Sequence, residues 1–144
     1  MKNVLTAADK ERIKLAVLSA ESQTSGEIRV HIDQSCNGDP LERAVALFQR
    51  LGMEATKYRN AALIYLSIKD NKVAIVGDVE LNKVVPPHFW DDECDLMISF
   101  FKQGKIAEGL CAGVVEVGNE LARHFPLTAD SLNELPNELS FGDE

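Results

Sequence analysis

The chain has 144 residues, of which 45% are hydrophobic and 26% are charged, and its formal net charge is −8. This size and composition favour one globular core over two and exclude a disordered chain. The negative charge disfavours nucleic acid and anionic lipid as partners, because both are themselves anionic, and it makes cations better candidates.

The termini and the cysteines predict a soluble protein of the cytoplasm. Residues 1–6 are too polar and too short for a secretory signal, and no window approaches the ~18 apolar residues of a membrane span. Cys36, Cys94 and Cys111 are far apart and odd in number, which is typical of reduced thiols. Their spacing matches no zinc site.

The first part of the chain predicts a helix, a strand and a second helix. Thr6 is typical of a helix N-cap, and apolar residues follow it at helical spacing. Residues 27–33 alternate between polar and apolar side chains, which indicates a strand. Asp39 and Pro40 then begin a helix that ends near Gly52.

The middle of the chain predicts a strand hairpin, and two helices follow it. Residues 61–68 are almost continuously apolar, which is typical of a central strand covered on both faces. A tight turn at residues 70–71 leads to an antiparallel partner at residues 72–77. The two helices are expected at about residues 89–102 and 105–124.

This element order predicts one α/β domain over residues 1–125 and an acidic tail over residues 126–144. The first two strands are joined through a helix, so they should run parallel, and the third strand turns back beside the second. The result is a small mixed β-sheet flanked by helices on both faces. In the tail we expect at most one short turn. No long apolar stripe is left over, so we expect a monomer.

The same topology places polar residues at one edge of the sheet. Ser25 and Glu27 start the first strand, Arg59 and Asn60 precede the second, and Asp78 follows the third. Oxygen ligands of this kind suit Ca²⁺ or Mg²⁺. We therefore expect a divalent metal site whose ligands are Glu27, Asn60, Asp78 and Ser25.

A purely structural alternative exists for the same residues. Glu27 would pair with Arg59, whereas Asn60 would cap a strand end and Asp78 would cap the next turn.

Further carboxylates provide second-choice ligands. Glu80 lies close to the same edge in sequence, and Asp91 and Asp92 lie early in a predicted helix. For Asp91 and Asp92 the structural interpretation is the stronger one, because acids in the first turn complement the helix dipole.

Seven segments form a set that is distinctive by its order and spacing. They are residues 25–30, 59–60, 63–66, 75–78, 89–90, 101–104 and 108–113. Together they resemble the TPM domain family, which includes thylakoid-lumen and photosystem-repair proteins and a modulator of nematode acetylcholine receptors. The likeness covers roughly residues 5–125.

The resemblance implies an α/β/α sandwich. It also implies the binding of calcium or another divalent metal found in some members, and the acid phosphatase activity of plant relatives. Most family members are exported or membrane-anchored, whereas this chain resembles the short cytosolic branch. The family usually has another glycine after the position of Gly77, and here residues 78–81 contain none. The shape of this loop should therefore differ.

Three functions remain open. The first is a metal-binding module that acts through another protein, and the second is a metal-assisted phosphatase for small phosphoesters, with Arg59 as the anion contact. The third is a metal-free protein-interaction domain.

The sequence contains no evident nucleophile. His31, His88 and His124 are isolated in sequence, and Cys36 has no base beside it. Whether the protein is an enzyme is therefore open, and the binding module is favoured.

Overall fold

The computed structural model describes residues 5–127 and 140–142. The two helices and the one strand predicted for the first part of the chain, the hairpin and the two later helices are all present. Two short elements, at residues 79–82 and 140–141, were not expected. The elements follow the chain as α1 (Ala7–Glu21), β1 (Ile28–Asp33), α2 (Pro40–Arg50), β2 (Ala62–Ser67), β3 (Lys72–Gly77), α3 (Val79–Asn82), α4 (Phe89–Phe101), α5 (Ile106–His124) and β4 (Ser140–Phe141).

The strands form one sheet in the order β3-β2-β1-β4. β1 runs parallel to β2, and β2 runs antiparallel to β3, as the sequence predicts. β4 lies in the segment expected to be an acidic tail, and it pairs in parallel with His31 and Ile32 of β1. The tail therefore contributes to the sheet, whereas the sequence predicted at most a short turn there. Residues 128–139 of the tail lie outside the described residues.

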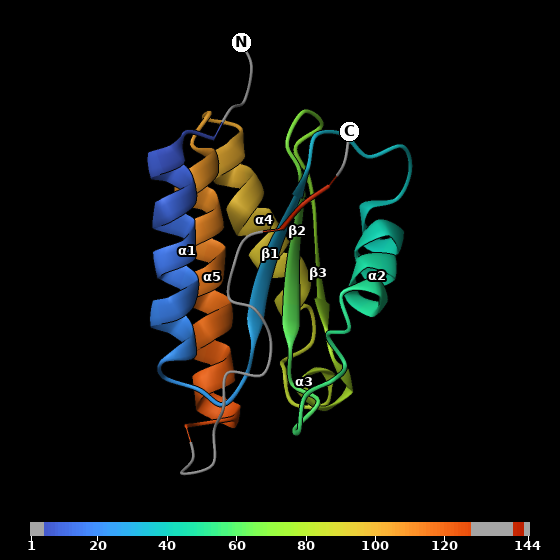
Figure 1. Ribbon diagram of the computed structural model, residues 1–144, viewed down its shortest axis with the longest axis vertical. Coiled ribbons are helices and arrows are strands. Elements are labelled where there is room, and N and C mark those ends of the chain that lie inside the picture. The colour runs from blue at the N-terminus through green and yellow to red at the C-terminus, as the bar shows by residue number, and fades with distance from the viewer. Residues whose placement is uncertain (1–4, 128–139, 143–144) are drawn as a thin grey trace.

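Helices cover both faces of the sheet. α1, α4 and α5 lie on one face and α2 lies on the other (Figure 1). Each face has its own apolar cluster, the larger one under α1, α4 and α5. The predicted layered α/β architecture is thereby confirmed.

The alternation of side chains along the strands explains these two clusters. Every residue of β2 is buried, with Ile64 in the larger cluster and Tyr65 in the smaller one under α2. On β1, Val30 and Ile32 belong to the larger cluster, so the alternate, polar residues of this strand face α2. The α2 side of β1 is therefore a polar stripe inside the molecule.

Close contact between the helices depends on glycines of α5. A Cβ atom at Gly118 would lie 2.7 Å from the Cβ atom of Ala20 on α1. A Cβ atom at Gly113 would lie 2.5 Å from the sulfur of Met97, which is fully buried on α4. These glycines let α5 pack tightly between its two neighbours.

Candidate functional site

The backbone brings the predicted edge residues to one end of the sheet. Ala62, the first residue of β2, pairs with Ile28 on one side and with Gly77 on the other. Glu27 and Asp78 therefore flank the start of β2. This register agrees with the strand directions predicted from the sequence.

Asp78 is engaged by an arginine. Its carboxylate, 4% exposed, accepts hydrogen bonds from Arg59 Nε at 2.7 Å and from Arg59 Nη2 at 2.9 Å. Oδ1 also accepts from the backbone N–H of Val79 at 2.8 Å and so caps α3. The hydrogen bond to Asp78 raises the pKa of Arg59. The structural alternative for Asp78, a cap on the next turn, is thus present.

Ser25 and Asn60 are in contact at the start of the parallel pair. Asn60 Nδ2 donates to Ser25 Oγ at 3.4 Å, and Ser25 Oγ donates to the carbonyl oxygen of Phe125 at 3.4 Å. Asn60 is 1% exposed, and its Oδ1 atom has no hydrogen-bond partner within the described part of the chain. An unsatisfied buried oxygen costs about 1–3 kcal/mol, so a ligand that fills this position would be stabilising.

Glu21, the last residue of α1, joins this end of the sheet. Its Oε2 atom accepts from the backbone N–H of Ile28 at 2.6 Å, and its Oε1 atom is buried without a hydrogen-bond partner among the described residues. Burial raises the pKa of Glu21 to about 8, the hydrogen bond from Ile28 lowers it, and the neighbouring Glu27 raises it further. Glu27 is itself buried. Two carboxyl groups therefore share a poorly solvated position.

Glu21 was not among the predicted site residues because its partner, the backbone of Ile28, lies across a loop. Glu21 ends a helix, and residues 22–27 then turn the chain so that β1 begins beside that helix end. Its signal in the sequence was only an acid in the last turn of a helix, where a negative charge opposes the helix dipole. That unfavourable placement is a weak indication of a function.

The second-choice carboxylates have ordinary surface roles. Glu80 pairs with Lys83 at 2.9 Å on the exposed side of α3. Asp91 lies 3.7 Å from His88 with both side chains more than 80% exposed, and Asp92 follows it in the first turn of α4. Their position fits the dipole interpretation made from the sequence.

Carboxylates alone do not complete a metal site at this end. Within residues 5–127 and 140–142, no three Asp, Glu, His or Cys side chains gather in an arrangement that would hold a metal ion. A cation near Glu21 and Glu27 would depend on neutral protein oxygens and on water for its remaining ligands.

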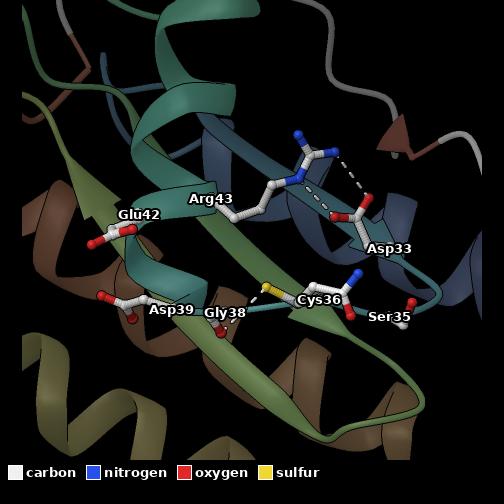
Figure 2. A pocket seen from close by; sticks show the side chains of 8 residues that line it. Asp33, Ser35, Cys36, Gly38, Asp39, Glu42 and Arg43 are labelled. Atoms are coloured by element: carbon white, nitrogen blue, oxygen red, sulfur yellow. Dashed lines mark hydrogen bonds and ion pairs between the residues drawn. The ribbon is translucent and has the colours of Figure 1, made fainter.

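A pocket of about 390 Å³ lies at the opposite end of β1. Figure 2 shows Arg43 of α2 reaching Asp33, and the Cys36 thiol directed at the carbonyl oxygen of Gly38. The residues that line the pocket are Asp33, Ser35, Cys36, Asn37, Gly38, Asp39, Glu42 and Arg43. No histidine is among these described lining residues, so Cys36 gains no imidazole base here.

Asp33 connects the strands to α2. Its carboxylate accepts from Arg43 Nε at 2.9 Å and from the Tyr65 hydroxyl at 2.7 Å, and it lies 3.0 Å from His31 Nε2. Burial opposes ionisation, but these three hydrogen bonds together lower the pKa of Asp33. His31 was expected to be isolated, but the structure places it beside Asp33, a charged partner two residues away on the same face of the strand.

A family model described as the TPM domain matches residues 1–120. The chain belongs to the TPM domain family. The resemblance carried by the sequence segments is therefore confirmed. A search of the curated proteins finds no match.

Solved structures agree with this assignment. The TPM domain is similar to the BA42 protein from the psychrophilic bacterium Bizionia argentinensis, with 40% identity, a TM-score of 0.88, and coverage of 96% of this chain and 95% of that chain. It is also similar to the N-terminal domain of a protein from P. gingivalis, with 25% identity, a TM-score of 0.69, and coverage of 84% and 78%.

The N-terminal domain of the cg2496 protein from Corynebacterium glutamicum shares the fold alone. It is 16% identical, with a TM-score of 0.63 and coverage of 93% of this chain and 78% of that chain.

None of the helices in the described residues has the length and apolar character needed to cross a membrane.

Proposed function

We propose that this TPM domain binds a divalent cation, Ca²⁺ or Mg²⁺, at the end of the sheet where β1 and β2 begin. One observation supports the proposal most. Glu21 Oε1 and Asn60 Oδ1 lie at this end, and both are buried without a hydrogen-bond partner in the described residues. Both atoms are oxygens, and a hard cation supplies the positive partner that such oxygens lack.

The ligand set that we propose combines charged and neutral oxygens. Glu27 and Glu21 provide carboxylates, Asn60 provides its amide oxygen, Ser25 provides its hydroxyl, and water completes the shell. Asp78 joins only when Arg59 turns towards solvent, and the 43% exposure of the Arg59 side chain leaves room for that movement.

This ligand set predicts a weak site. Affinity for Ca²⁺ depends on the number of charged ligands and on the rigidity of the site, and the weakest protein sites bind at about 10⁻⁴–10⁻³ M. Such a site suits a module that responds to millimolar ion concentrations. We propose that the module acts on another protein in the cytoplasm, since the sequence offers no evident nucleophile for hydrolysis.

Replacing Glu27 by glutamine is expected to weaken Ca²⁺ binding by at least about tenfold, since it removes one of the two carboxylates. The measurement is a titration with Ca²⁺, and then with Mg²⁺, followed by backbone amide shifts. In the wild type, saturable shifts should group at residues 21–27 and around Asn60.

The matched control is Glu11→Gln, which removes one negative charge from an exposed position on α1. This variant should bind as the wild type does. Equal weakening in both variants would mean that Ca²⁺ only screens the net negative charge, and the proposed site would be rejected. The amide spectrum of each metal-free variant verifies that it is folded.

A further inference from the structure

A groove of about 520 Å³ runs along the outer edge of β3, between α2 and α4. β3 contributes residues 73–77 to its lining, α2 contributes Leu41 and Val45, and α4 contributes Trp90 and Cys94. β3 is the last strand at its end of the sheet, and none of the other strands in the described residues pairs with its outer side (Figure 1). The groove therefore exposes the edge of a strand.

The register of β3 determines which of its backbone groups point into the groove. The N–H of Asp78, the residue after β3, donates to the carbonyl oxygen of Ala61 at 2.9 Å, so Asp78 points toward β2. Because the direction of the backbone groups alternates along a strand, the residues two and four positions earlier also point toward β2. The N–H and C=O groups of Val73 and Ile75 then point outward, into the groove.

Neighbouring side chains already occupy part of this edge. Asn82 Nδ2 donates to the carbonyl oxygen of Gly77 at 2.7 Å, and Asn82 Oδ1 accepts from Trp90 Nε1 at 3.0 Å. Burial raises the pKa of the Cys94 thiol to about 12, and a hydrogen bond from the backbone of Ile75 opposes the rise. Sulfur is a weak acceptor, so a peptide carbonyl oxygen would be a stronger partner for that N–H group.

An acidic side chain lies at each end of the groove. Asp39 follows Gly38, whose carbonyl oxygen accepts a hydrogen bond from Lys72 at the start of β3. Asp91 lies at the other end, where its charge adds to the effect of burial on the pKa of Cys94. No lysine or arginine is among the described lining residues. A ligand in the groove therefore meets apolar walls between two negative charges.

We propose that this groove binds an extended segment of another protein, which adds a strand to the outer edge of β3. The backbone of the segment pairs with Val73 and Ile75, and its side chains point alternately toward the two walls. Leu41 and Val45 are 49% and 42% exposed, so one wall still has apolar surface to bury. The acids at the two ends favour a segment with apolar residues in its middle and a lysine or arginine at each end.

A second copy of this chain is a poor occupant of the groove. The chain has a net charge of −8, and pairing of two β3 edges would bring the same acids together. The groove gives the partner protein of the proposed function a surface to bind, but it shares no residue with the proposed cation site. It can therefore be tested without Ca²⁺, and failure of one proposal leaves the other standing.

The probe is a synthetic peptide in which valine and threonine alternate, with a lysine at each end. Its titration should give saturable amide shifts at residues 41–45 and 73–77, and the amides of Val73 and Ile75 should become protected from hydrogen exchange. Leu41→Ala should weaken binding about fivefold, because it removes apolar surface that the peptide covers. The matched control is Leu15→Ala on α1, where the leucine is 54% exposed, and it should leave binding unchanged.

Any of four results would overturn the proposal. They are the absence of saturable shifts, equal weakening in Leu41→Ala and Leu15→Ala, equally tight binding of a peptide with glutamates in place of the lysines, and a dimer of the free protein that pairs through β3. Both leucines are exposed, so both variants should fold normally, and the spectrum of each peptide-free variant verifies this.

Discussion

Replacing Asp33 by alanine is expected to lower the free energy of unfolding by about 3–5 kcal/mol, because its charged carboxylate accepts hydrogen bonds from two side chains and each such bond contributes about 1.5–3 kcal/mol. Asp33 is 5% exposed and is the acceptor for both Arg43 and Tyr65. Without it, the fully buried Tyr65 hydroxyl loses the acceptor for its proton, which costs about 1–3 kcal/mol by itself. Urea denaturation measures the change.

The control for this prediction is Asp95→Ala, at an exposed position on α4. A surface substitution of this kind should change the free energy of unfolding by no more than about 0.5 kcal/mol. If Asp33→Ala is no more destabilising than Asp95→Ala, then Asp33 does not connect β1 and β2 to α2 in the way described.

Glu21 is expected to make the metal-free domain less stable as pH rises. Its pKa is raised from 4.5 to about 8 in the folded state, because burial disfavours the charged form. The folded state therefore holds this proton where the unfolded state has lost it. The stabilisation is complete below pH 4.5 and is lost as pH rises to about 8.

Glu21→Gln removes this titration and keeps an oxygen for the N–H of Ile28. The variant and the wild type should be similarly stable near pH 4.5, and the variant should be more stable above about pH 8. We expect a difference of about 3 kcal/mol there, less than the full linkage value, since solvent screens part of the carboxyl group. Urea denaturation at several pH values tests this, and a difference that does not change with pH would contradict it.

The same proton bears on cation binding. A metal ligand must be deprotonated, so binding near neutral pH should release the proton of Glu21. Affinity should therefore rise with pH until Glu21 is ionised.

Periodicity and chain direction predicted much of the fold. The alternation in β1, the apolar run of β2 and the tight turn before β3 are local signals, and they were sufficient for the pairing of all three strands. From that pairing it followed that Glu27 and Asp78 would flank the start of β2. β4 was missed because it has two residues, too few to show a period.

The side-chain partners could not be predicted in the same way. Arg59 was expected beside the metal, and the structure pairs it with Asp78. Glu21 becomes relevant only when a loop places it against β1, and no spacing in the sequence encodes that contact. His31 and Asp33 are the exception, because two residues apart on one strand they share a face, and this pair was predictable.

Paramagnetic broadening by Mn²⁺ tests the proposed cation site most directly, since Mn²⁺ accepts the same oxygen ligands as Mg²⁺ and Ca²⁺. At low Mn²⁺ concentration, the amide signals of Glu21, Glu27 and Asn60 should broaden first, and excess Ca²⁺ should restore them. Broadening that centres on Asp91 and Asp92 at the start of α4, or that spreads evenly over the acidic surface, would contradict the cation site.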